Sequence, residues 1–115
     1  LDYPDYETEA SIIYAKARMP MDVCQLITKI VRELRDSGAC EFSPTIRAGI
    51  MIAKTMTVMK LEPEDDTQLF TTYCQDILAS ETSRLAKRTN QQEIKSLIKE
   101  IIDKQTLNMR PFMAV

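Results

Sequence analysis

Prolines at positions 20, 44 and 63 divide the chain into segments in which apolar residues recur with helical spacing. Because proline breaks a backbone hydrogen bond inside a helix, each of these positions favours a nearby helix start. No segment shows the strict alternation of apolar and polar residues that is typical of a half-buried strand. The sequence therefore predicts an all-α fold, a bundle of about five helices.

Three helices are expected in the first half of the chain. Asp5 can cap the first, in which Glu7 and Glu9 suit the positive end of the helix dipole. Gly38 offers a left-handed end to the second, whose polar positions include Arg32 and Arg35 and whose apolar stripe is Val23, Leu26, Ile27, Ile30, Val31 and Leu34. Ser43 followed by Pro44 predicts the start of a third helix over 45–60, which is apolar on most sides and is expected at the buried centre.

Two more helices are expected in the second half. Residues 61–66 form a natural break before a fourth amphipathic helix, with Leu69, Phe70, Tyr73, Cys74, Ile77 and Leu78 as its stripe. Thr89 and Gln92 have the spacing of a capping box ahead of a fifth, whose stripe is Ile94, Leu97, Ile98, Ile101 and Ile102. We therefore divide the chain into a helical domain over residues 1–106 and a C-terminal tail over 107–115.

Two residue types are too scarce for most kinds of catalytic site. Gly38 and Gly49 are the only glycines, so neither a phosphate-binding loop nor a dinucleotide-binding turn can be formed from this sequence. The chain has no histidine, which excludes Ser–His and Cys–His pairs and histidine-ligated metals. We expect no catalytic residue and no metal site in this chain.

The charge balance and apolar pattern also exclude some partners. Fifteen Lys and Arg residues against seventeen Asp and Glu give a net charge of −2, which argues against a nucleic-acid partner. The longest apolar run, residues 48–53, is far below the roughly 18–20 residues of a membrane span. The three cysteines have no close spacing and suit reduced thiols in the cytoplasm. Because the chain begins with Leu1 and has no leader, we expect a piece of a larger protein.

Arg47 is the strongest candidate for a ligand contact. It falls in the first turn of the expected third helix, where free backbone N–H groups and the helix dipole already favour an anion. A guanidinium there can add bidentate hydrogen bonds to a phosphate. The alternative is an ordinary surface arginine, solvated or paired with Glu41.

Two stretches of sequence resemble the MoxR-type AAA+ ATPases. Residues 1–9 (LDYPDYETE) are similar to the junction between the ATPase core and the helical lid of that family. Residues 42–48 (FSPTIRA) look like the lid segment that carries the sensor-2 arginine. In many relatives the arginine directly follows a serine–proline or serine–threonine pair, whereas Thr45 and Ile46 intervene here. Residues 69–70, 74–80 and 82–84 resemble the gas vesicle assembly branch of the family.

The resemblance implies that this chain is the C-terminal lid of an AAA+ ATPase involved in gas vesicle assembly. Such a lid closes over ATP and Mg²⁺ that the missing core binds, and the isolated chain needs no cofactor. The expected partners are the chain's own ATPase core, other copies in a ring that is commonly hexameric, and gas vesicle shell or assembly proteins. The expected location is the cytoplasm, in association with gas vesicles. Arg47 would be the sensor-2 residue that contacts phosphate, and Tyr3, at the hinge, could approach the adenine.

Two alternatives remain open at the level of sequence. One is the lid of another MoxR-type chaperone ATPase. The other is a free-standing helical interaction module that never meets nucleotide and docks through its last helix and tail, with Met109, Phe112, Met113 and Val115 as contact residues.

Overall fold

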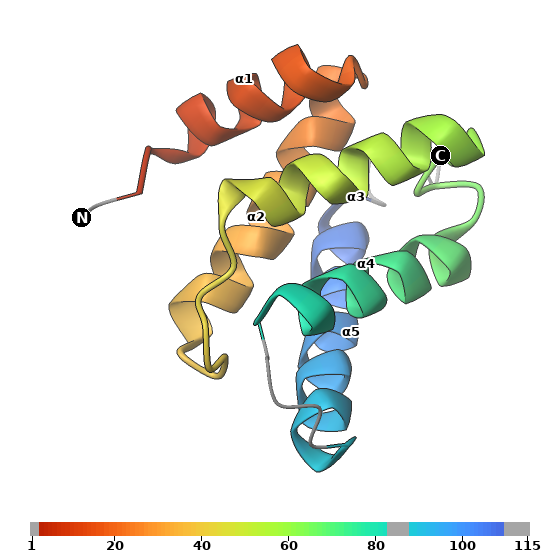
Figure 1. Ribbon diagram of the computed structural model, residues 1–115. Helices are drawn as coiled ribbons and strands as arrows, with labels where there is room; N and C mark the ends of the chain where they lie inside the picture. Colours follow the sequence, from red (N-terminus) through yellow and green to blue (C-terminus); the bar gives the residue numbers. More distant parts are fainter. Residues whose placement is uncertain (1–2, 83–87, 110–115) are drawn as a thin grey trace.

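The computed structural model describes residues 3–82 and 88–109, which contain five α-helices and no β-strand. The helices are α1 (Tyr6–Ala17), α2 (Met21–Ser37), α3 (Ile46–Met59), α4 (Thr67–Thr82) and α5 (Arg88–Met109) (Figure 1). The predicted all-α fold is confirmed. Within the two described ranges, no helix combines the length and apolar character that crossing a membrane would require.

Four of the helices pack as a closed ring. Helix α2 packs on α3, α3 on α4, α4 on α5, and α5 returns to α2. The short α1 lies across α2 and α3, at the top of Figure 1. Helices α1, α2 and α3 therefore all pack against one another, and the α4–α5 pair completes the bundle through α3 and α2.

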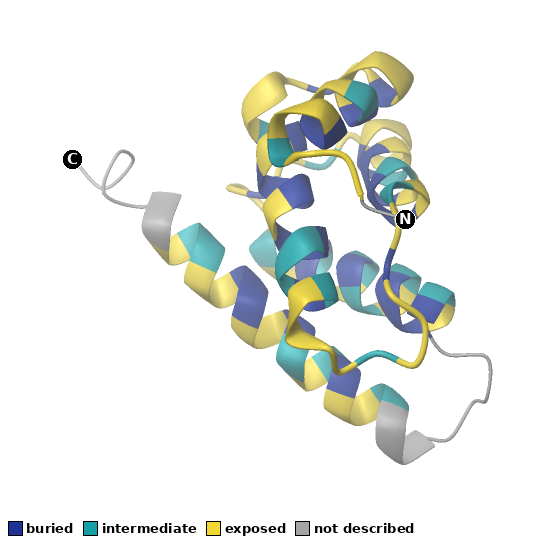
Figure 2. Cartoon of the chain, turned by 90° about the vertical axis from the view of Figure 1, so that its left-hand side faces the viewer, coloured by how far each residue is buried: buried dark blue, intermediate teal, exposed yellow. Residues whose placement is uncertain are grey.

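The core lies inside this ring, and the apolar stripes predicted for α2 and α5 face it. Figure 2 shows buried positions recurring along α5 between exposed ones. The largest fully buried apolar side chains are Phe70, Ile13, Ile27, Ile30, Leu34, Ile52, Met56, Leu78, Ile98 and Ile102. Cys24 and Cys74 are buried free thiols, and burial raises the pKa of each. Both therefore behave as small apolar core residues.

The crossing of α1 and α3 depends on a glycine. A Cβ atom at Gly49 would lie 2.8 Å from the Ile13 Cδ1 atom and 3.6 Å from the Ile27 Cγ2 atom. Because both isoleucines are buried in the core, they have little room to move away. The absent side chain thus lets α3 approach α1 and α2 closely.

Two of the predicted helix ends are confirmed. The Asp5 side chain caps α1 and accepts a hydrogen bond of 2.8 Å from the Thr8 N–H. Gly38 ends α2 in the left-handed conformation, with φ of 69°. Arg18 and Lys60 end α1 and α3 in the same conformation, which non-glycine residues adopt at a cost in free energy.

The predicted start of α3 differs from the structure by one residue, and its predicted cap by two. The helix begins at Ile46, and the capping residue is Thr45, which has extended backbone and makes no side-chain capping bond. Ser43 and Pro44 precede the helix in an irregular segment, and Pro44 is buried. Arg35 of α2 donates a hydrogen bond to the Pro44 carbonyl, so a tertiary contact rather than a local cap holds the chain at this boundary.

Three other expectations need correction or extension. Helix α3 is not buried on all sides, because Met51, Val58 and Met59 are exposed. Helix α5 begins at Arg88, so Thr89 lies inside the helix rather than capping it. The helix continues to Met109, past the start of the predicted tail, and residues 110–115 lie outside the described residues.

Candidate functional site

Arg47 lies in the first turn of α3 with its side chain 80% exposed. The first turn of a helix has backbone N–H groups without intrahelical partners, and the side chain of Thr45 does not satisfy them. Helix α3 also contains no Asp or Glu, so no carboxylate of its own opposes the positive end of its dipole. The guanidinium of Arg47 can therefore reach outward to an anion.

Glu81 is the acidic neighbour of this arginine. It lies near the end of α4, and its Oε1 atom is 3.9 Å from the Arg47 Nε atom. The Phe42 N–H donates a 3.0 Å hydrogen bond to the Thr82 carbonyl, which holds the segment before α3 against the end of α4. The partner proposed from sequence, Glu41, makes no ion pair with Arg47 in the described residues. An exposed pair at 3.9 Å contributes little free energy, so a phosphate could displace Glu81.

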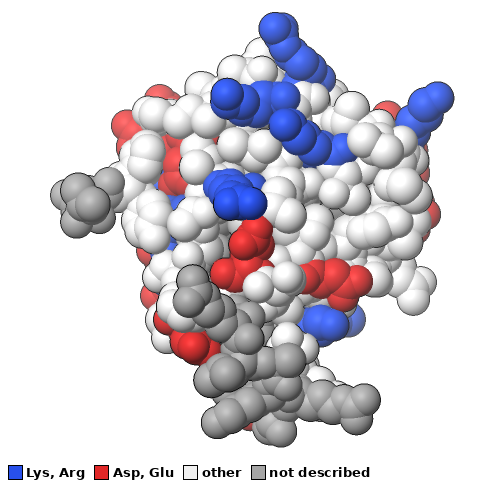
Figure 3. All heavy atoms as spheres, in the orientation of Figure 1, with Lys and Arg blue, Asp and Glu red and all other residues white. Residues whose placement is uncertain are grey.

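The exposed charges differ across the molecule. Figure 3 shows Lys and Arg side chains gathered over the upper part of one face, where α1 and α3 lie. The exposed cations of these two helices and their ends are Lys16, Arg18, Arg47, Lys54 and Lys60. In contrast, residues 62–66 after α3 carry four carboxylates. Lys60 and these carboxylates therefore lie together at the C-terminal end of α3.

Tyr3 lies beside an arginine of α2 rather than in open solvent. The centroid of its ring is 3.8 Å from the guanidinium carbon of Arg35, and its side chain is about half exposed. Arg35 also donates a 2.9 Å hydrogen bond from Nε to the Pro44 carbonyl, three residues before Arg47. The two predicted site residues are thus connected through one side chain of α2.

A buried carboxylate near Tyr3 was missed by the sequence analysis. Glu9 is 1% exposed, and it accepts hydrogen bonds of 2.7 and 2.9 Å from the two terminal nitrogens of Arg35. Arg32 donates to the same carboxylate and, at 2.8 Å, to the Pro4 carbonyl. We call Glu9, Arg32 and Arg35 the Glu9 cluster. It ties the segment before α1 to α2, and through Pro44 to the start of α3.

The charge state of Glu9 follows from these contacts. Burial alone raises the pKa of Glu9, but the hydrogen bonds and positive charges of Arg35 and Arg32 lower it below the ordinary value of 4.5. Glu9 is therefore ionised at neutral pH and forms charge-assisted hydrogen bonds with both arginines.

A pH dependence of stability is expected from this pKa. Because the pKa of Glu9 is lower in the folded than in the unfolded state, the carboxylate stabilises the fold above about pH 4.5, and this stabilisation is lost as the pH falls through the folded-state pKa. The unfolding free energy of the natural chain should exceed that of Glu9→Gln by a steady amount near neutral pH. The difference should shrink below about pH 4.5, whereas other carboxylates titrate in both proteins and cancel. Urea denaturation at a series of pH values measures this, and a difference unchanged down to about pH 2 contradicts it.

In the described part of the chain, no three Cys, Asp or Glu side chains converge. Some predicted positions lie outside it: residues 1–2 and 83–84 of the resembling stretches, and the tail residues Phe112, Met113 and Val115.

The chain is similar to part of a gas vesicle ATPase. It is 34% identical over 80 residues to the gas vesicle ATPase GvpN of Ancylobacter aquaticus. The match covers 70% of this chain and 22% of that protein, so the chain spans about a fifth of the length of the relative that it matches. No family model and no solved structure matches the chain. The similarity agrees with the resemblance seen in the sequence and extends over most of the chain.

Proposed function

We propose that this chain is the C-terminal helical lid of an AAA+ ATPase that takes part in gas vesicle assembly. The similarity to part of a gas vesicle ATPase supports this assignment. The chain has only two glycines and cannot form a phosphate-binding loop, so the parent's ATP-binding core must lie elsewhere. The observation that carries the proposal is the exposed Arg47 guanidinium at the start of α3.

Arg47 would act as a conformational reporter of bound nucleotide. When the lid closes over ATP, the guanidinium would donate charge-assisted hydrogen bonds to a phosphate, and it would lose them when the lid opens. Nucleotide then shifts the lid toward closure, because it binds the closed state more tightly than the open one. Arg47 would exchange the weak contact with Glu81 for this stronger one.

The proposal also defines what this chain does not supply. Arg47 and the first turn of α3 would contact a phosphate group, and no three Cys, Asp or Glu side chains converge among the described residues as ligands for Mg²⁺. ATP and Mg²⁺ would therefore be held by the core of the full-length parent. The parent would act as a cytoplasmic ring, commonly hexameric, on gas vesicle shell or assembly proteins, as the family resemblance implies. Tyr3, already stacked on Arg35, would approach the adenine only from its exposed side.

Substitution of Arg47 in the full-length parent tests the proposal. Arg47→Ala should lower ATP turnover by about tenfold or more, because a hydrogen bond to a charged group contributes about 1.5–3 kcal/mol. Glu81→Gln, which removes the competing carboxylate, should leave turnover equal or higher. The matched control is Lys54→Ala, an exposed cation two turns further along α3, which should leave turnover within about twofold.

Steady-state ATPase assays, together with nucleotide binding by calorimetry, measure these effects. The full-length parent should bind ATP, and the present chain alone should show no measurable affinity. Unchanged turnover in Arg47→Ala would remove the proposed role. Tight ATP binding by the isolated chain would contradict the assignment of this chain as a lid.

A further inference from the structure

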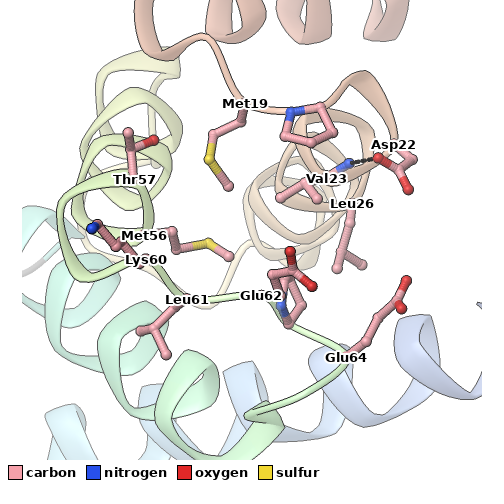
Figure 4. Close-up of a pocket in the computed structure, with 12 residues that line it drawn as sticks. Met19, Asp22, Val23, Leu26, Met56, Thr57, Lys60, Leu61, Glu62 and Glu64 are labelled. Atoms are coloured by element: carbon pink, nitrogen blue, oxygen red, sulfur yellow. Dashed lines mark hydrogen bonds between the residues drawn. The ribbon is translucent and has the colours of Figure 1, made fainter.

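A groove opens at the end of the bundle opposite to the start of α3. It lies between the loop before α2, the first turns of α2, the last turn of α3 and the loop that follows α3 (Figure 4). Its volume is about 490 Å³, within the range of pockets that bind ligands. Its lining residues include Met19, Val23, Leu26, Met56 and Leu61. The groove shares no residue with the Arg47 site or the Glu9 cluster.

The floor of the groove is apolar and adaptable. Val23 and Leu61 give the accessible apolar surface of the lining, whereas Met19, Leu26 and Met56 are buried. The side chains of Met19 and Met56 point toward the centre of the groove (Figure 4). Thioether side chains are flexible and polarisable, so they can adjust to apolar groups of different shape. The floor therefore suits an inserted aliphatic or aromatic side chain more than a polar group.

The rim of the groove is acidic. Asp22, Glu62 and Glu64 lie around it, with Lys60 as the one cation among the lining residues. None of these three carboxylates takes part in an ion pair within the described residues. Asp65 and Asp66 follow directly in the chain and add to the negative charge. Such a rim repels phosphate-bearing ligands and attracts cationic ones.

We propose that this groove binds an amphipathic, cationic segment of a partner protein. Apolar side chains of the segment would pack on Val23 and Leu61, above the buried Met19 and Met56, and flanking Lys or Arg residues would pair with Glu62, Glu64 and Asp22. The apolar contacts provide affinity, and the acidic rim selects the charge of the partner. This interaction requires no nucleotide, so it can be tested independently of the role proposed for Arg47.

A peptide series tests the proposal on the isolated chain. The probe is a synthetic helical peptide with leucines on one face and flanking lysines, and its two matched controls carry glutamates in place of the lysines or alanines in place of the leucines. We expect the lysine–leucine peptide to bind about tenfold or more tightly than either control. Fluorescence anisotropy measures the affinities, and NMR shift changes should map to residues 19–26 and 56–64.

Charge reversal in the chain provides the matching test. The double variant Glu62→Lys/Glu64→Lys should weaken binding of the lysine–leucine peptide by about tenfold, because two attractive contacts become repulsive. Asp36→Lys is the control, because it reverses one charge away from the groove. Asp36 lies about 20 Å along α2 from Asp22, so this variant should change the affinity less than twofold. All three positions are exposed, and circular dichroism verifies folding. Equal binding of the lysine and glutamate peptides, shift changes elsewhere, or no binding would overturn the proposal.

Discussion

Replacing Glu9 with alanine is expected to lower the free energy of unfolding by about 3–5 kcal/mol. The carboxylate is 1% exposed. Arg35, which donates two hydrogen bonds to it, has a side chain only 7% exposed. Removing Glu9 leaves the Arg35 charge buried without its partner. The loss therefore measures the cost of an unpaired buried charge, not the net value of the ion pair.

Glu7→Ala is the matched control for this variant. It makes the same substitution two residues earlier in α1, at an exposed position without an ion pair in the described residues. The expected change is within about 0.5 kcal/mol. Urea denaturation at neutral pH, followed by circular dichroism, gives both values. Because a whole domain is stable by only about 5–15 kcal/mol, Glu9→Gln should be measured as well, as a variant that retains the shape of the side chain. Losses below about 1 kcal/mol in both Glu9 variants would contradict the structural role of the cluster.

Phe70→Ala is expected to cost about 3–5 kcal/mol of unfolding free energy for a different reason. Phe70 lies in α4 and is fully buried among the core residues of the bundle. Truncation removes its apolar contacts and leaves a cavity that tightly packed neighbours cannot fill completely. Phe70→Leu should lose less, because most of the apolar volume remains.

Tyr14→Ala is the control for the aromatic substitution. Tyr14 also lies in a helix, but its side chain is about half exposed, so its removal should cost less than about 1 kcal/mol. Thermal and urea denaturation of the three variants provide the ranking. If Phe70→Ala and Tyr14→Ala cost the same, the core does not lie where the structure places it.

Helical periodicity was sufficient to predict the elements that bury one face. The stripe of α2 from Leu26 to Leu34 is buried as predicted. In the α5 stripe, Ile94, Ile98, Ile101 and Ile102 are buried, whereas Leu97 is partly buried. In α3 the same rule failed, because a pattern shows which residues are apolar but not whether another helix covers them. Met51, Val58 and Met59 therefore look like core residues in sequence and are exposed in the fold.

The candidate site was less predictable than the fold. The position of Arg47 within the first turn of α3 could be predicted from the sequence, but its neighbour Glu81 comes from another helix. The sequence placed Arg35 among the polar positions of α2, outside its apolar stripe. Its burial depends on Glu9, 26 residues earlier in the chain, and local spacing carries no information about such a pair. The groove likewise combines residues from two loops and two helices.

The Glu9 cluster has a mechanical consequence. Arg32 and Arg35 lie one turn apart on α2. Together they donate hydrogen bonds to the Pro4 carbonyl, the Glu9 carboxylate and the Pro44 carbonyl. The backbone at Pro4 is thus connected through α2 to the segment that leads into α3. If the chain moves as the proposed lid, these bonds would make Arg47 move together with the start of the chain.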